Sequence, residues 1–142
     1  MNSTSASNQS IGVAIAGLGF GEAVHLPALR ATNGLHPVAI WHPRNERLKQ
    51  ASEENDLKGY SNWDSLINDP NVDAIIIATP PSPRYELAIS ALEAGKHLLL
   101  EKPGALSVEQ IINLQKISIK KRLSIAVDFE YRAVPLFMKA KR

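Results

Sequence analysis

From residue 11 onward the sequence alternates between short apolar runs and longer segments whose apolar residues recur at helical spacing. The apolar runs have the length of single strands, and the segments between them are long enough to cross back over a sheet. This alternation is typical of strand, helix, strand units on a parallel sheet that is buried on both faces. We therefore predict an α/β fold, a doubly wound parallel sheet of about six strands in a single domain.

The boundaries of the expected elements follow from turn residues and helix caps. Strands are expected at residues 12–16, 36–41, 58–61, 72–78, 96–101 and 124–129. Helices are expected at residues 45–54 and 83–94, and from a Ser107 cap with Gln110 as its capping-box partner. A helix after Gly21 contains Pro27, so it is expected to be kinked or to begin near that proline.

Composition excludes several classes of protein. The 142 residues include no Cys, which rules out thiolate nucleophiles, disulfides and Cys-containing zinc sites. No apolar run reaches the roughly 18 residues of a membrane span, and the first ten residues lack the regions of a secretory signal. We expect a cytoplasmic protein with no membrane association, in which residues 1–10 form a disordered tail.

Basic residues are concentrated toward the C-terminus. Residues 116–142 hold 8 Lys and Arg against 2 Asp and Glu. The cluster at residues 116–122 is interpreted as a solvated helix end, where cations suit the helix dipole. Nucleic-acid binding is not expected, because no aromatic-interleaved or recognised module accompanies the charge.

A glycine-rich turn follows directly on the first predicted strand. Residues 17–21 read Gly-Leu-Gly-Phe-Gly at the junction with a helix. In a dinucleotide-binding turn the first glycine permits the tight turn, the second lets the backbone approach a pyrophosphate, and the helix N-terminus supplies N–H groups. Glu22 stands where the third glycine of the fingerprint falls, with Gly21 one place early. The motif alone is weak, so a merely structural turn remains open.

The end of the second strand indicates which ribose is bound. An acidic side chain there hydrogen-bonds a free 2′-hydroxyl, whereas basic and small polar side chains accommodate a 2′-phosphate. The sequence passes through His42 and Arg44 with no carboxylate near the strand end. We therefore expect NADP to be preferred over NAD, with a surface arginine beside a helix start as the alternative interpretation of Arg44.

Two further strands end in residues suited to a ligand. One ends in Ala-Thr-Pro at residues 78–80, at the carboxyl edge of the sheet where ligands bind in such folds. The next ends in Glu101 and Lys102, followed by Pro103. An ion pair beside an apolar strand costs desolvation free energy, so both side chains are candidates for function. The alternative is that both point into solvent.

Together these segments resemble the Gfo/Idh/MocA family, the glucose-fructose oxidoreductase and inositol dehydrogenase group of NAD(P)-dependent enzymes. The resemblance rests on the glycine turn with His25 and Pro27 after it, on residues 73–81, and on residues 94–97 leading to Glu-Lys-Pro at 101–103. It covers about residues 11–137. It implies an NAD(P)-binding Rossmann domain at residues 11–130 and hydride transfer to or from a sugar-like or polyol substrate.

The resemblance also implies roles for individual residues. It places the pyrophosphate at Gly17, Gly19, Phe20 and Gly21, the adenosine ribose at His42 and Arg44, the middle of the cofactor at Ala78, Thr79 and Pro80, and the nicotinamide at Glu101 and Lys102. Lys102 is the candidate catalytic residue, oriented toward the substrate to polarise it or relay a proton. A cis peptide bond before Pro103 is expected, Arg132 matches a position close to the active site, and no metal is expected.

Three departures limit what the resemblance implies. Arg84 stands where the family usually has His, which leaves its role open. Glu22 in place of a small residue is expected to set the first helix slightly further from the sheet. Family members continue into a second α/β domain that supplies the substrate pocket, and residues 131–142 are expected to begin the connection to it.

The length leaves three alternatives open: a fragment, a truncated gene product, or a nucleotide domain that works with a partner. A small-molecule substrate is expected only if a second domain is supplied. A non-catalytic dinucleotide-binding module is the alternative function, and a structural remnant that binds nothing is a third reading.

Overall fold

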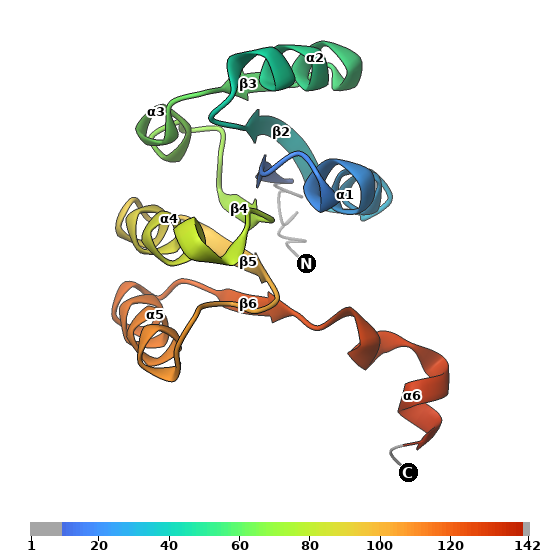
Figure 1. Ribbon diagram of the computed structural model, residues 1–142, viewed down its shortest axis with the longest axis vertical. Coiled ribbons are helices and arrows are strands. Elements are labelled where there is room, and N and C mark those ends of the chain that lie inside the picture. Colours follow the sequence, from blue (N-terminus) through green and yellow to red (C-terminus); the bar gives the residue numbers. More distant parts are fainter. Residues whose placement is uncertain (1–9, 141–142) are drawn as a thin grey trace, which may run out of the picture.

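The structure is a computed structural model that describes residues 10–140. Its centre is one sheet of six parallel strands in the order β3-β2-β1-β4-β5-β6, with helices on both faces (Figure 1). The strands are β1 (Ile11–Ala16), β2 (Leu35–Trp41), β3 (Lys58–Tyr60), β4 (Ala74–Ile77), β5 (His97–Glu101) and β6 (Ile125–Asp128). The predicted doubly wound α/β fold is confirmed. The chain winds outward from β1 to β3 and then, in the other direction, from β4 to β6, so the strand order reverses between β1 and β4.

The central strands are the most apolar because both of their faces are covered. Ile75, Ile76 and Ile77 in β4 are all buried, as the three consecutive isoleucines predict. The register between β1 and β2 shifts where Val13 pairs with Pro37 and Ala14 pairs with Ala39. A proline lacks the N–H that a regular ladder needs, which is why strand irregularities accumulate at such residues.

Within residues 10–140, eight helical segments surround or follow the sheet. They are η1 (Gly21–His25), α1 (Leu26–Arg30), α2 (Asn45–Asn55), α3 (Trp63–Ile67), α4 (Pro81–Glu93), α5 (Val108–Lys121), η2 (Glu130–Ala133) and α6 (Pro135–Ala140). The predicted cap of α5 is confirmed, since the Ser107 hydroxyl accepts a hydrogen bond of 3.3 Å from Gln110 N. The Gln110 side chain reaches back to Leu106 N at 2.9 Å, one residue before the expected partner.

The helix after the glycine turn is irregular, as the position of Pro27 predicts. A π-helical turn, η1, leads directly into α1, and Pro27 lies in the first turn of α1, where its missing N–H costs no hydrogen bond. Helix α3 was not predicted, because five residues are too few to show a period. Its Asn62 cap accepts a hydrogen bond of 2.8 Å from Ser65 N.

The core divides into two layers, one on each face of the sheet. Alanines 14 and 16 and isoleucines 75 and 77 point to the face covered by α3, α4 and α5. Val13, Ile15 and Ile40 point to the opposite face, where α1 and α2 pack. Because successive side chains of a strand alternate between faces, the same short strands supply both layers.

The C-terminal segment leaves the sheet after β6 and extends away from it (Figure 1). Leu136, Phe137 and Met138 in α6 are exposed, and the Phe137 ring packs edge-on against Tyr131 with centroids 5.7 Å apart. The expectation that residues 131–142 begin a connection to another domain stays a prediction.

Ser10 is the one residue of the predicted tail that the structure describes, and its hydroxyl lies 2.8 Å from His36 Nδ1. Residues 1–9 of that tail lie outside the described residues. Within residues 10–140, no helix has the length and apolar character needed to cross a membrane. The expected cytoplasmic location and the expected lack of nucleic-acid binding stay predictions.

Candidate functional site

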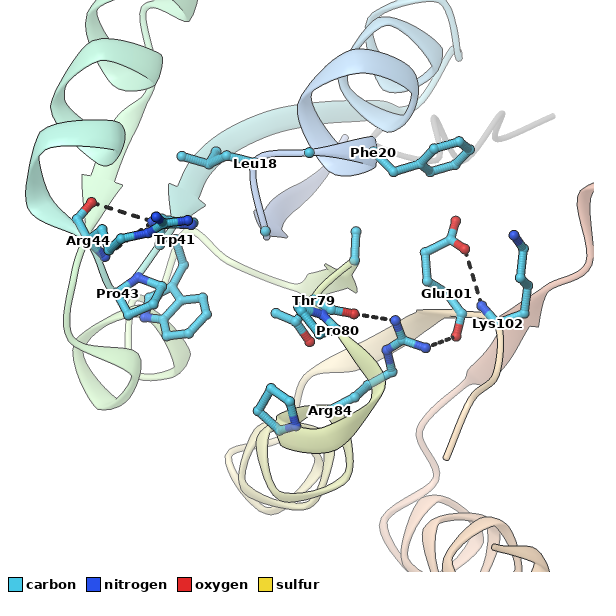
Figure 2. Close-up of a pocket in the computed structure, with 15 residues that line it drawn as sticks. Leu18, Phe20, Trp41, Pro43, Arg44, Thr79, Pro80, Arg84, Glu101 and Lys102 are labelled. Atoms are coloured by element: carbon cyan, nitrogen blue, oxygen red, sulfur yellow. Dashed lines mark hydrogen bonds between the residues drawn. The ribbon is translucent and has the colours of Figure 1, made fainter. Parts of the chain in front are cut away.

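A cavity of about 860 Å³ lies at the carboxyl edge of the sheet, beside the point where the strand order reverses. Figure 2 shows its lining residues, which come from the glycine turn, the end of β2, the end of β4, the first turn of α4 (Pro81–Glu93) and the end of β5. The predicted site residues that line it are Gly17, Gly19, Phe20, His42, Arg44, Ala78, Thr79, Pro80, Glu101 and Lys102. Gly21 does not line the cavity. The fold therefore gathers residues from five segments around one hollow.

The three glycines of the turn meet different requirements. Gly17 has a φ of +104°, and a Cβ there would lie 2.8 Å from the carbonyl oxygen of Ala78. Gly19 has no atom within 4 Å of an added Cβ, so the space above it is open. A Cβ at Gly21 would lie 2.7 Å from Ile15 Cγ2, which means that the helix makes its close approach to the sheet at this glycine.

Glu22 does not hold the first helix away from the sheet, contrary to the expectation. Gly21 takes the packing role, and the Glu22 side chain points toward α2 instead. Its two carboxylate oxygens accept hydrogen bonds of 3.0 Å from Arg47 Nη2 and 3.1 Å from Asn55 Nδ2. Glu22 therefore ties the glycine-rich helix to α2.

The end of β2 forms the basic side of the cavity. His42 Nδ1 accepts a hydrogen bond of 3.1 Å from Arg44 N, which fixes the turn into α2. A smaller hollow of about 330 Å³ adjoins the main cavity here, and it is lined by Leu18, Gly19, His42, Arg44, Glu46 and Arg47. Arg47 was not predicted as a site residue. Its signal in the sequence was a second arginine one helical turn after Arg44.

The end of β4 forms the floor of the cavity. Ala78 N donates a hydrogen bond of 2.8 Å to Ala16 O, which holds the segment against the glycine turn. The Thr79 side chain is buried, and its hydroxyl has no hydrogen-bond partner among the described residues. Trp41 Nε1 and Arg84 Nε, also in the lining, are buried and unpartnered within the same described part of the chain. Such groups are rare in folded proteins and are a feature of sites that bind a ligand or ordered water.

Arg84 is almost wholly buried, with 3% of its surface exposed, and it reaches from α4 under the floor of the cavity. Its guanidinium donates to the carbonyl oxygens of Thr79 and Glu101, at 2.5 Å in the case of Glu101 (Figure 2), and also to that of Pro103. Burial lowers the pKa of this guanidinium below its usual value, and the nearby Glu101 carboxylate opposes that shift. Arginine nevertheless keeps its charge in proteins, so a cation lies beneath the site.

Glu101 and Lys102 end β5 at the far side of the cavity. Glu101 is buried, while Lys102 is exposed, and Lys102 Nζ lies 3.5 Å from Glu130 Oε1. The alternative in which both side chains point into solvent is therefore wrong for Glu101. The peptide bond between Lys102 and Pro103 is cis, as expected.

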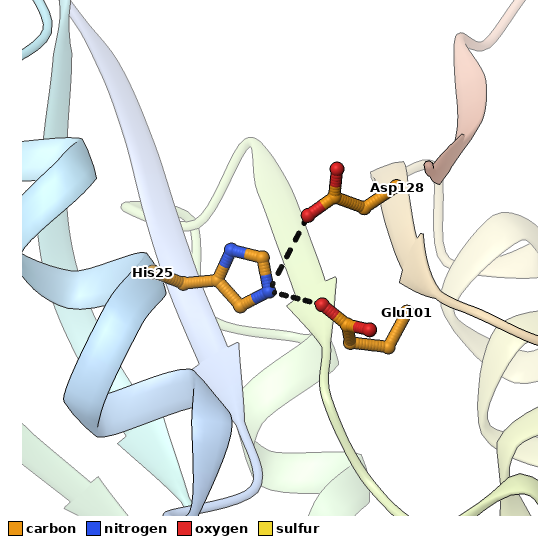
Figure 3. A group of neighbouring side chains, drawn as sticks. All are labelled: His25, Glu101 and Asp128. Atoms are coloured by element: carbon orange, nitrogen blue, oxygen red, sulfur yellow. Dashed lines mark hydrogen bonds and ion pairs between the residues drawn. The ribbon is translucent and has the colours of Figure 1, made fainter. Parts of the chain in front are cut away.

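His25 and Asp128 accompany Glu101, and neither was predicted to have a role (Figure 3). A hydrogen bond of 2.9 Å joins His25 Nε2 to Glu101 Oε1, and Asp128 Oδ2 lies 4.0 Å from the same ring nitrogen. The ligand atoms of the three side chains lie within 4.8 Å of one another, close enough to hold a metal ion. The hydrogen bond satisfies His25 Nε2 and Glu101 Oε1, and Glu101 Oε2 accepts a further one of 3.2 Å from Lys102 N.

Comparison with known proteins identifies the lineage of this fold. Residues 11–129 match the sequence profile of Gfo/Idh/MocA, described as an oxidoreductase family with an NAD-binding Rossmann fold. The chain belongs to this family. The resemblance that the sequence motifs indicated is thus confirmed, and so is the NAD(P)-binding character of the domain.

Curated relatives in the Gfo/Idh/MocA family include proteins with named activities. An uncharacterised oxidoreductase from Synechocystis is 42% identical over 124 residues, which cover 87% of this chain and 33% of the relative. Levoglucosan dehydrogenase from Pseudarthrobacter phenanthrenivorans is 39% identical over 82 residues, which cover 58% of this chain and 21% of the enzyme. The chain thus spans a third or less of the length of these relatives.

Solved structures show the same fold with a cofactor bound. A 3-ketoreductase from Actinomadura kijaniata, in complex with NADP and TDP-benzene, superposes with a TM-score of 0.87 at 27% identity. The match covers 92% of this chain and 40% of the ketoreductase. That enzyme, whose structure contains NADP, thus shares the fold of this chain over 40% of its own length.

Proposed function

We propose that this chain binds NADP or NAD at the carboxyl edge of its sheet and forms the cofactor-binding part of an oxidoreductase. One observation carries the proposal: the cavity at the switch point is bounded by a glycine turn at one end and by Lys102 at the other. In open α/β sheets this crevice is the place where dinucleotides bind. The proposed reaction is hydride transfer to or from a sugar-like or polyol substrate.

The residues present fit a dinucleotide. The open space above Gly19 leaves the backbone of the turn accessible to a phosphate. The buried and unpartnered groups Trp41 Nε1 and Thr79 Oγ1 lie in the lining, where a polar ligand offers partners. The cavity volume of about 860 Å³ lies in the range of sites that enclose ligands of substantial size.

The chemistry divides between the cofactor and the chain. A bound nicotinamide supplies or accepts the hydride. Lys102 is the proposed catalytic residue, because its exposed ammonium group stands at the mouth of the cavity where a substrate hydroxyl or carbonyl can approach. There it polarises the substrate oxygen and holds or releases a proton as the bond order of that oxygen changes.

A preference for NADP over NAD forms part of the proposal. Arg44 and Arg47 line the smaller hollow beside His42, and charged guanidinium groups bind phosphate through paired hydrogen bonds. Glu46 is the only carboxylate among the residues that line this hollow. The negative charge of the ribose 2′-phosphate of NADP is attracted by both arginines, of which Arg47 also pairs with Glu22 at 3.0 Å.

The substrate class and the domain division are proposed from the relatives. Levoglucosan dehydrogenase acts on a sugar-like molecule by its name, and this chain is similar to only part of that enzyme and of the 3-ketoreductase. The substrate pocket is proposed to lie in sequence that those longer proteins have beyond the matched region.

The experiment that tests the proposal is a fluorescence titration of the purified chain with NADPH and NADH. Trp41 lines the cavity, and its ring packs edge-on against Trp63 with centroids 5.2 Å apart. Excitation of these tryptophans is therefore expected to produce energy transfer to a bound reduced nicotinamide. We expect saturable transfer with both ligands, and tighter binding of NADPH.

The control is 5′-AMP, which competes at the adenosine end but accepts no energy from tryptophan. It is expected to displace both ligands. Absence of binding by a chain that circular dichroism shows to be folded would contradict the proposed function. Equal affinity for NADPH and NADH would contradict only the preference for NADP.

A further inference from the structure

Arg84 occupies a position that the proposed function does not use. Its side chain crosses from α4 to the ends of two strands and to the turn after β5. It donates hydrogen bonds to three carbonyl oxygens, those of Thr79, Glu101 and Pro103. These carbonyls belong to the cavity floor and to the segment that carries Lys102.

The ladder between β4 and β5 ends before these carbonyls, while β5 still pairs with β6 at Glu101 and Asp128. The register between β4 and β5 ends at the pair formed by Ile77 and Leu100. Beyond that pair the two chains separate, one into Thr79 and Pro80 and the other into the Lys102–Pro103 turn. Buried carbonyl groups need a donor, and here a single side chain supplies it.

The guanidinium is suited to this task by its shape. It is planar and rigid and offers five N–H donors, so it can serve acceptors that lie on different sides. Within residues 10–140, no carboxylate oxygen lies within 4.0 Å of its nitrogens, so the charge is directed at carbonyl dipoles and forms no ion pair. A lysine ammonium at this position is a point charge with three donors and a shorter reach.

We infer that Arg84 is a positioning residue that joins the ends of β4 and β5 to the Lys102–Pro103 turn and thereby fixes the nicotinamide half of the cavity. The inference rests on the proposed function for the identity of the ligand. His25 holds the same segment from the other side, through the carboxylate of Glu101. The segment that carries Lys102 is thus held by Arg84 on one side and by His25 on the other.

The test compares two ligands that share one half. NADPH fills both halves of the cavity, whereas 2′,5′-ADP carries only the adenosine half and the 2′-phosphate. Arg84→Met removes the donors and keeps much of the volume. We expect the Kd for NADPH to rise at least tenfold and the Kd for 2′,5′-ADP to change less than twofold. Arg84→Lys keeps the charge and serves fewer carbonyls, so its Kd for NADPH is expected to be intermediate.

A matched control is available in the same chain. Arg30 Nη2 also donates to a backbone carbonyl, that of Asn55 at 2.7 Å, but the contact is exposed. Arg30→Met is expected to leave the affinities for both ligands unchanged. An equal loss of both ligands in folded Arg84→Met, or no loss of NADPH affinity, would overturn the inference. Full recovery of NADPH affinity in Arg84→Lys would do the same, because charge alone would then suffice.

Amide hydrogen exchange gives a second readout that needs no cofactor. In Arg84→Met we expect the amides of Lys102, Gly104 and Ala105 to exchange at least tenfold faster, while those of β1 keep their rates. Acceleration by the same factor in β1 would indicate a general loss of stability and would overturn the positioning role, as would unchanged rates at the turn.

The exchange readout also separates the two proposals. If the wild-type chain binds neither dinucleotide, the proposed function fails, while the exchange rates still decide whether Arg84 holds the turn. If Arg84→Met does not fold, Arg84→Lys provides the same comparison, with increases in the same direction and smaller in size.

Discussion

The amino edge and the carboxyl edge of the parallel sheet differ in how fully their buried polar side chains are hydrogen-bonded. At the amino edge, before β4, Asp69 accepts hydrogen bonds from the Tyr60 hydroxyl, from Lys58 Nζ at 3.1 Å and from Asn71 N at 2.8 Å. Lys96 Nζ donates to the carbonyl of the same aspartate at 3.0 Å. Polar groups that are fully paired in this way stabilise a fold and leave little for a ligand to bind.

At the carboxyl edge the buried groups are left partly unsatisfied. The side-chain atoms Trp41 Nε1, Thr79 Oγ1 and Arg84 Nε are buried, and no partner for them is found among the described residues. The glycine turn at this edge also leaves open space above Gly19. The comparison teaches that, among the described residues, the buried side-chain atoms without a partner lie at the carboxyl edge, although that edge also carries the paired groups of His25, Glu101 and Arg84.

The largest expected effect is a loss of cofactor binding at the carboxyl edge without a loss of stability. Gly19→Val is expected to weaken NADPH binding at least a hundredfold, because a branched side chain fills the space that a phosphate needs. No protein atom lies within 4 Å of the added Cβ, so the free energy of unfolding is expected to change by no more than about 0.5 kcal/mol. Fluorescence titration and urea unfolding measure the two quantities.

Gly17→Ala is the contrasting variant. Its positive φ and the nearby Ala78 carbonyl make an added Cβ strained, so this variant is expected to lose stability as well as binding. Retained NADPH affinity in folded Gly19→Val would place the phosphates elsewhere.

The second prediction is a loss of stability at the amino edge without a loss of cofactor binding. Asp69→Asn is expected to lower the free energy of unfolding by about 1–3 kcal/mol at pH 7, because the buried carboxylate loses its charge and one of its two accepting oxygens. NADPH affinity is expected to be unchanged, since Asp69 does not line the main cavity. Urea unfolding at pH 7 measures the loss of stability. The control is Asp64→Asn at an exposed position, which is expected to change the free energy of unfolding by no more than about 0.5 kcal/mol. A loss of cofactor affinity in Asp69→Asn would contradict the claim that the amino edge serves stability and not cofactor binding.

The same aspartate predicts a pH dependence. The hydrogen bond from the Tyr60 hydroxyl, with those from Asn71 and Lys58, holds the pKa of Asp69 well below its usual range. A depressed pKa in the folded state contributes stability that is complete above the unfolded value of about 3.9 and is lost as pH falls through the folded value. The difference in stability between wild type and Asp69→Asn is therefore expected to narrow steadily below about pH 4. A constant difference from pH 7 to pH 3 would contradict the assignment.

A third, smaller effect concerns the choice between NADPH and NADH at the carboxyl edge. Arg44→Ala is expected to weaken NADPH about tenfold and NADH less than twofold, because the loss of one charged contact to phosphate is worth roughly 1.4 kcal/mol. Both ligands are titrated at two salt concentrations. The loss of affinity caused by Arg44→Ala is expected to differ less between NADPH and NADH at high salt. Lys49→Ala, on an exposed face of α2, is the control. Equal losses for the two ligands would remove the argument for NADP.

The smallest expected effect concerns Lys102. Lys102→Ala is expected to change the Kd for NADPH by no more than about twofold, since its ammonium group is exposed and is proposed to act on substrate. In a protein that also contains the substrate-binding part, the same variant is expected to lower kcat strongly. A full-rate variant there would exclude the proposed catalytic role.

Much of this arrangement could be predicted from local sequence. The glycine turn, the residues after β4 and the Glu-Lys-Pro ending of β5 were all expected to meet at one edge, because parallel strands end on the same side. The structure places them there. Gly21 shows the limit of motif reading: it was expected against the pyrophosphate, yet it packs on Ile15 and lies outside the cavity lining.

Other features depend on contacts that no local pattern reveals. His25 meets Glu101 across 76 residues of sequence, and Asp128 joins them because the register of β5 and β6 sets it opposite Glu101. The sequence left the role of Arg84 open, and only the packing of α4 against the sheet buries its side chain. Glu22 and Arg47 likewise meet only because η1 and α2 lie on the same face.

The sequence by itself determined the class of fold and the edge that carries the site. Periodicity and strand-ending residues are local properties, and the right-handed crossovers of a parallel sheet leave few ways to assemble them. The tertiary structure alone decided which polar groups are paired and which are left for a ligand. Pairing depends on distances of about 3 Å between residues far apart in the chain, and only the folded backbone sets those distances.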